Sequence, residues 1–138
     1  MNGKALPPPG AAGPGPAQVL GRPAPLVIAE ISANHNQSLS RALELVEAAA
    51  ETGADGIKLQ TYTPDSMTLD LATGDFVIDD PQSPWHGWTL YQLYQKGQTP
   101  AEWHAPLFCR ARELGLLAFS TPFDEAAVDF LQQFDPPA

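Results

Sequence analysis

The fold is predicted by one continuous stretch, residues 26–60, which reads LVIAEISANHNQSLSRALELVEAAAETGADGIKLQ. Its start, Leu26 to Ala29, is a short apolar run without alternation, typical of a strand buried on both faces in a parallel sheet. Apolar residues then recur at helical spacing from Ser38 to Thr52, and Gly53 ends the helix. Asp55 to Gln60 follows after a very short loop and predicts a second strand, so the stretch predicts a right-handed βαβ unit.

The same order of strand and helix returns towards the C-terminus. Thr99 to Glu102 has the pattern of a capping box and predicts the start of a second helix. Leu116 to Ser120 predicts a third strand, and Asp124 opens a third helix that Pro136 and Pro137 end. The second helix is predicted to be amphipathic, to contain Trp103, Leu107, Cys109, Ala111 and Leu114, and to end at Gly115.

A long segment, Thr61 to Gln98, separates the second strand from the second helix. It is rich in turn formers and aromatic residues and is too long for an ordinary connection, and such excursions usually carry function. Its aromatic residues are able to line a sugar pocket by stacking, but local packing under a long loop is the interpretation we favour. These residues are Trp85, Trp88, Tyr91 and Tyr94.

Length limits how much of an architecture the chain can hold. Its 138 residues are about half of the roughly 200 to 250 that a closed (β/α)₈ barrel needs. We therefore predict an α/β fold that is a partial (β/α)8 TIM barrel: the first three βα units, over residues 26–138. Residues 1–25 are dominated by Pro, Gly and Ala and predict a disordered leader, with a Pro-rich docking segment as the weaker alternative.

Composition excludes several classes of function. A formal net charge of −9 with only seven Lys and Arg residues argues against a nucleic-acid surface, so an anionic substrate must be captured locally. A single cysteine, Cys109, allows no internal disulfide, and no apolar run approaches a membrane span or a signal peptide. We expect a cytoplasmic protein without a membrane partner.

Polar side chains follow each predicted strand, where parallel (β/α) folds place their catalytic groups. Glu30 is a candidate general acid or base, provided that burial raises its pKa, and Asn34 lies just beyond it. Lys58 binds either a substrate anion or Glu30 in a structural ion pair, and Gln60 follows it.

The third strand ends in Ser120 and Thr121, which either form an anion site at a helix N-terminus or cap that helix. Asn36 and Gln37 more simply build a turn. His35 has no neighbours that complete a metal site, and His86 and His104 are expected to be structural or exposed.

Three segments together resemble the nonulosonic acid synthases, the family of pseudaminic and sialic acid synthases. They are IAEISANHN at 28–36, ADGIKLQTYTPD at 54–65 and FSTPFD at 119–124. Ser32 follows Ile31 where the sialic acid enzymes usually have Gly, so the resemblance favours the pseudaminic acid type over the N-acetylneuraminic acid type.

The resemblance implies a transferase of carbohydrate biosynthesis. It would condense phosphoenolpyruvate with an N-acetylated amino sugar to a nine-carbon 2-keto sugar acid, aided by a divalent metal, Mn²⁺ or Mg²⁺. By position, Lys58 and Thr121 match residues that hold phosphoenolpyruvate, Gln60 matches one that approaches the sugar, and Glu30 matches the acid that handles protons. Ser120 and Asn34 are further candidates for substrate binding.

The resemblance also implies what this chain lacks. The family's metal ligands follow beyond Ala138, so we expect no metal site here, and the full-length enzyme is expected to be a homo-oligomer. Three βα units leave an open sheet edge, so we expect no turnover by the isolated chain. The alternative is a noncatalytic remnant, or a complementing half that needs a partner chain.

Overall fold

Three parallel strands form the centre of the protein. The structure, a computed structural model, describes residues 25–137, so the predicted disordered leader lies almost wholly outside the described residues. The strands are β1 (Ile28–Glu30), β2 (Gly56–Thr61) and β3 (Leu117–Pro122), in the spatial order β1-β2-β3. This confirms the predicted α/β fold with a parallel sheet.

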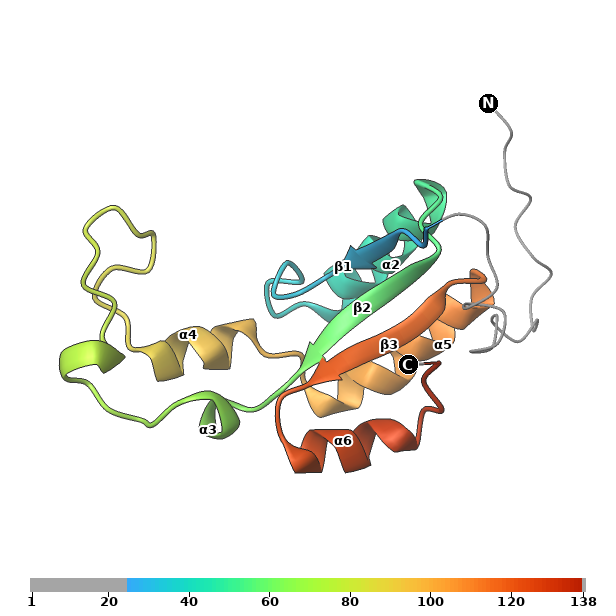
Figure 1. Ribbon diagram of the computed structural model, residues 1–138. Coiled ribbons are helices and arrows are strands. Elements are labelled where there is room, and N and C mark those ends of the chain that lie inside the picture. Colours follow the sequence, from blue (N-terminus) through green and yellow to red (C-terminus); the bar gives the residue numbers. More distant parts are fainter. Residues whose placement is uncertain (1–24, 138) are drawn as a thin grey trace.

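One helix follows each strand, in the order that the sequence predicted. The helices are α2 (Leu39–Glu51), α5 (His104–Glu113) and α6 (Glu125–Gln132). Figure 1 shows α2 and α5 behind the sheet and α6 beside β3, while the front face of the sheet carries no helix of the described part of the chain. The sheet therefore has one covered face and one face open to a ligand or to further structure.

Local sequence explains where α2 begins and ends. The Ser38 side chain accepts a hydrogen bond from the backbone N–H of Arg41 and caps the N-terminus. Gly53, with φ of +83°, follows the C-cap in the left-handed region that glycine tolerates. Between these ends the helix buries Ala42, Val46 and Ala49.

The core lies between the covered face of the sheet and these helices. Strand residues Ile57, Leu59 and Ala118 are buried there against Leu107 and Phe108 of α5. Phe108 is 1% exposed, whereas Cys109, which lies within α5 as predicted, is on the exposed side of the helix.

The start of α5 also differs from the prediction. A 3₁₀ turn, η2 (Ala101–Trp103), precedes the helix, and neither Pro100 before the turn nor Trp103 before α5 caps it with a side chain. Thr99 is buried rather than placed at a helix N-cap. The capping box predicted from Thr99 to Glu102 is therefore absent, because the chain tightens into a 3₁₀ turn before the α-helix begins.

The long excursion forms an arm, residues 62–98, that extends away from the sheet (Figure 1). It contains α3 (Pro64–Met67), a 3₁₀ turn η1 (Gly74–Phe76) and α4 (Leu90–Gly97), with α3 and α4 in contact. A capping box at Thr89 and Gln92 starts α4, a signal that the sequence reading missed. None of the helices within residues 25–137 is long and apolar enough to cross a membrane.

A substitution at Gly56 tests how closely the central strand packs against β3. A Cβ added there would lie 2.8 Å from Leu117 Cβ and 2.9 Å from the Leu117 carbonyl oxygen. We expect Gly56→Ala to lower the free energy of unfolding by about 1–3 kcal/mol, measured by urea denaturation. Gly53→Ala is the comparison, since its Cβ meets nothing and only its positive φ costs about 1 kcal/mol. A Gly56→Ala protein as stable as the wild type would contradict this strand packing.

Candidate active site

Glu30 is the centre of a polar cluster at the carboxyl ends of β1 and β2. It is the register partner of Lys58, and its Oε2 lies 3.1 Å from Lys58 Nζ. Gln60 donates from Nε2 to Glu30 Oε1 at 2.7 Å, and the Ser32 hydroxyl donates to the same oxygen at 3.4 Å. The structure thus brings together three residues that the sequence singled out and adds Ser32, which was not among the predicted site residues.

These contacts determine the charge state of Glu30. The hydrogen bonds from Lys58 and then Gln60 lower the pKa of Glu30 below its ordinary value, and the small effect of burial opposes them only in part. The condition set for a general acid or base, a pKa raised by burial, is therefore not met while Lys58 and Gln60 are bound to Glu30. As folded, Glu30 is an ionised carboxylate, suited to accept a proton or a hydrogen bond.

Lys58 makes the ion pair that was one of its two predicted roles. Both partners remain partly open to solvent, with side chains 32% exposed for Lys58 and 39% for Glu30. An ion pair of this exposure contributes under about 1 kcal/mol. An incoming anion is therefore able to take Glu30's place beside the ammonium at little cost.

Thr121 lies next to this cluster, because its β3 position pairs with Gln60 of β2 and paired residues in a parallel sheet share a face. The helix N-terminus that follows it is already occupied. Asp124 caps α6 by accepting a hydrogen bond from the Ala127 N–H at 2.6 Å. Of the two predicted readings of this segment, the structure shows capping, and Asp124 is the residue that does it.

Ser120 lies on the opposite face of the sheet from Gln60 and Thr121. Its hydroxyl contacts Thr61 Oγ1 at 2.6 Å, and the same Thr61 oxygen lies 2.8 Å from His104 Nε2. All three side chains are buried. The structure therefore does not bring Ser120 to the Glu30 cluster, and the side-chain alternation of β2 and β3 is the reason.

His104 is the third residue of this buried hydrogen-bonded group. Its Nδ1 lies 3.2 Å from the carbonyl oxygens of Pro100 and Ala101, which requires a proton on Nδ1 and leaves Nε2 to accept from Thr61. Burial lowers the pKa of His104 below its ordinary value, and the two carbonyls oppose that shift only in part. His104 is thus a neutral, structural residue, as one of the sequence alternatives had it.

Asn34 belongs to the loop between β1 and α2 and is not part of the cluster. Its Nδ2 donates to the Ile31 carbonyl at 2.9 Å, and its own carbonyl accepts from Arg41 Nε at 2.8 Å. Gln37 ties the loop to the arm by donating to the carbonyls of Lys96 and Gln98 at 2.9 and 2.8 Å. In the same loop Ser32, Asn36 and Gln37 have positive φ, between 48° and 57°, a conformation that costs energy for Ser and Gln more than for Asn.

The described residues offer no metal centre of their own. No group of three or more His, Cys, Asp or Glu side chains among residues 25–137 is arranged to hold an ion. The donors around Glu30 are an ammonium and an amide, and an ammonium beside the carboxylate opposes a cation there. The Glu30 cluster therefore does not fit a metal ion.

Residues 45–138 match the NeuB family. The chain belongs to this family. Pseudaminic acid synthases of Campylobacter jejuni subsp. jejuni serotype O:2 and of Helicobacter pylori are each 49% identical to it, over 80% and 82% of this chain. An N,N'-diacetyllegionaminic acid synthase of Legionella pneumophila is 38% identical over 76% of this chain.

This NeuB-family chain spans about a third of the length of these relatives: 32%, 33% and 29% of them, respectively. Solved structures agree on the fold. A spore coat polysaccharide biosynthesis protein SpsE of Bacillus subtilis, 36% identical, superposes with a TM-score of 0.58 over 85% of this chain and 29% of its own. An N-acetylneuraminic acid synthetase of Leptospira borgpetersenii, 22% identical, superposes with a TM-score of 0.61 over 80% of this chain and 33% of its own.

Stability should depend on pH through the buried histidines. Burial lowers the pKa of both His35 and His104, so below about pH 6.5 the unfolded chain binds more protons than the folded one. We expect the free energy of unfolding, measured in urea, to fall as the pH is lowered from about 7.5 to about 5.5.

Substitutions of single histidines show whether His104 causes this pH dependence. His104→Gln should reduce the slope but not abolish it, because glutamine can still contact Thr61 but does not titrate, while His35 still contributes. His86→Gln, at an exposed position, is the control. An equal slope in wild type and His104→Gln would show that His104 is not held neutral.

Proposed function

We propose that this chain supplies the first three βα units of a nonulosonic acid synthase, of the pseudaminic acid type. The reaction joins phosphoenolpyruvate to the open-chain aldehyde of an N-acetylated amino sugar. A carbon–carbon bond forms between the methylene carbon of phosphoenolpyruvate and the aldehyde carbon, water adds, and phosphate leaves. The product is a nine-carbon 2-keto sugar acid.

One observation carries this proposal: the Glu30, Lys58 and Gln60 cluster lies at the carboxyl ends of two adjacent parallel strands in a NeuB-family chain. Identity of 49% to two pseudaminic acid synthases, against 38% to a legionaminic acid synthase, supports the pseudaminic acid type.

Each side chain has a role that its contacts allow. Lys58 leaves Glu30 and pairs with the carboxylate or phosphate of phosphoenolpyruvate, and the Thr121 hydroxyl donates to the same substrate. Gln60, released by the same exchange, hydrogen-bonds the sugar. Without these two hydrogen bonds, which lower its pKa, Glu30 becomes a stronger base and accepts a proton during the condensation.

Other components would come from outside the described residues. A divalent metal, Mn²⁺ or Mg²⁺, would polarise the aldehyde when bound, and its ligands would belong to segments beyond those described. We propose a homo-oligomeric full-length enzyme, acting in the cytoplasm without nucleic acid or membrane partners.

A noncatalytic unit is the second candidate. Within the described residues, β1 and β3 are each paired on one side only, so both edges of the sheet offer free backbone groups. A complementing half or a remnant would keep the fold and lose turnover.

Substitutions at the ion pair separate the proposed roles. In a protein that carries any residues following Ala138, Lys58→Met should weaken phosphoenolpyruvate binding by about 10- to 100-fold by calorimetry, with Lys58→Arg intermediate. Glu30→Gln should preserve that binding, since it removes a competitor for Lys58, yet lower phosphate release at least about 100-fold. Glu44→Gln, on the exposed side of α2, is the control.

The two candidate functions differ in turnover. We expect the 138-residue chain to release no phosphate from phosphoenolpyruvate with Mn²⁺ and an N-acetylated amino sugar, and the longer protein to release it. Binding and turnover in neither protein would overturn the synthase proposal and leave the noncatalytic unit.

A further inference from the structure

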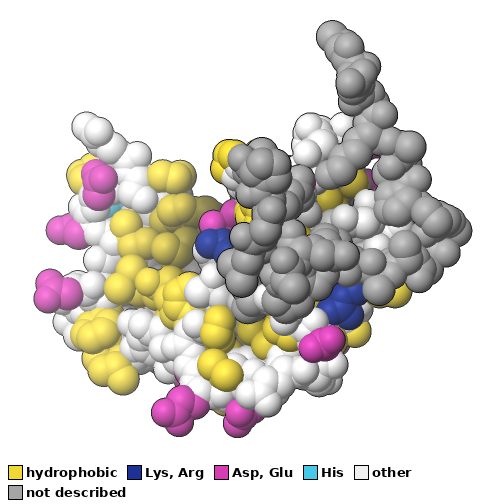
Figure 2. Space-filling model, turned by 45° about the vertical axis from the view of Figure 1, so that its right-hand side comes forward, with side chains coloured by type: hydrophobic (Ala, Val, Ile, Leu, Met, Phe, Trp, Pro, Cys, Tyr) yellow, Lys and Arg dark blue, Asp and Glu magenta, His cyan; other side chains and the backbone are white. Residues whose placement is uncertain are grey.

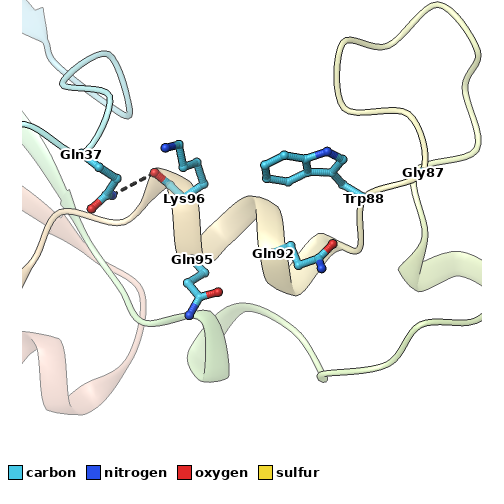
Figure 3. Close-up of a pocket in the computed structure, with 6 residues that line it drawn as sticks. All are labelled: Gln37, Gly87, Trp88, Gln92, Gln95 and Lys96. Atoms are coloured by element: carbon cyan, nitrogen blue, oxygen red, sulfur yellow. Dashed lines mark hydrogen bonds between the residues drawn. The ribbon is translucent and has the colours of Figure 1, made fainter.

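A second candidate site lies on the arm and shares no residue with the Glu30 cluster. It is a groove of about 600 Å³ along α4. Figure 3 shows Trp88 and Lys96 at its opposite ends, with Gln92 and Gln95 between them on the helix. Within α4 the stretch from Leu90 to Lys96 covers about 9 Å of helix axis, at 1.5 Å per residue, and Trp88 lies just before it. The lining residues are Gln37, Gly87, Trp88, Gln92, Gln95 and Lys96.

Trp88 presents a fixed apolar platform at one end of the groove. Its side chain is 37% exposed, although its ring is packed edge-to-face against Trp85 with centroids 5.1 Å apart. Its backbone is bonded on both sides, to Trp85 O at 2.9 Å and from Ile78 N at 2.9 Å. The packing expected for these aromatic residues therefore holds the indole in place without covering it, and an exposed flat ring suits the C–H face of a sugar.

The glutamines supply both donors and acceptors to the groove. Gln92 uses Oε1 to accept from the Thr89 N–H, which leaves its Nε2 to donate. Gln37 uses Nε2 for two backbone carbonyls, which leaves its Oε1 to accept. The exposed Gln95 side-chain amide adds an N–H donor and a carbonyl acceptor. Sugar hydroxyls, which donate and accept at once, fit such a mixed set.

Lys96 is the one basic side chain in residues 25–137 without an ion-pair or hydrogen-bond partner. Lys58 pairs with Glu30 and Arg110 with Glu47, while the guanidinium groups of Arg41 and Arg112 bond backbone carbonyls. In a chain of net charge −9, an unpaired ammonium is a local exception to general repulsion of anions. Figure 2 shows how few basic side chains the visible face carries beside its hydrophobic and acidic ones.

We propose that this groove binds an anionic sugar. The ring lies on Trp88, its hydroxyls bond the glutamines, and its carboxylate or phosphate pairs with Lys96. The inference stands on the groove alone and does not depend on the synthase reaction. Sugar acids and sugar phosphates share the required chemistry, so the experiment separates them.

Calorimetric titrations of the chain test the proposal with three probes: N-acetylneuraminic acid, N-acetylglucosamine 6-phosphate and neutral N-acetylglucosamine. We expect the charged sugars to bind more tightly than the neutral one and to weaken as NaCl is raised. The tighter of the two charged probes identifies carboxylate or phosphate as the natural group.

Variants locate the binding. Trp88→Ala should weaken the charged probes about tenfold, and Lys96→Gln about fivefold with loss of the preference over the neutral sugar. Glu44→Gln, on the exposed side of α2, should leave this binding unchanged. Binding that Lys58→Met abolishes and Lys96→Gln leaves intact would place the probes at the Glu30 cluster, so failure of this proposal is distinguishable from failure of the synthase proposal. Equal affinity for charged and neutral probes, no binding of any probe, or charged-sugar binding that Lys96→Gln leaves intact would each overturn it.

Discussion

The hydrogen bonding of β2 to both neighbouring strands is the constraint on which the rest of the structure depends. Parallel pairing fixes Lys58 opposite Glu30 on one side and Phe119 on the other. Because side chains alternate along a strand, the same register sends Lys58 and Gln60 to one face and Leu59 and Thr61 to the other. A shift by one residue would exchange the candidate active site with part of the core.

The two faces use polar groups for opposite purposes. On the open face, Glu30 and Lys58 neutralise each other while still partly solvated, which keeps the carboxylate ionised and the ammonium exchangeable. On the covered face, Thr61 joins Ser120 to His104 where all three side chains are buried, so loss of a partner is costly. The first arrangement suits ligand exchange, and the second holds β2 and β3 against α5.

The arm contributes exposed side chains that can bind a ligand but few residues of the hydrophobic core. Its aromatic residues divide between packing and exposure: Tyr62 is buried and edge-packed on Tyr94, whereas Trp85 and Trp88 keep 37% of their surface open. Gln37 joins the arm to the loop after β1 through two backbone carbonyls. The groove on α4 and the Glu30 cluster are therefore carried by segments that contact each other, although the two sites share no residue.

The signals that the sequence carried by itself were local. Apolar spacing identified the helix from Ser38 to Thr52 within one residue, and the strand-end positions of Glu30, Lys58 and Gln60 were enough to single them out. The local capping pattern gave a wrong prediction at Thr99, where an α-helix and a 3₁₀ turn compete as the next element. The chain forms the 3₁₀ turn η2, and the expected cap is absent.

Only the tertiary structure decided the strand register and the faces, which depend on residues far apart in the chain. It places Ser120 in the core with Thr61 and His104, and it lowers rather than raises the pKa of Glu30. Residue types along the chain determined which groups could do chemistry. Their charge states and partners followed from packing, because a pKa and a hydrogen bond are set by whatever neighbour the fold supplies.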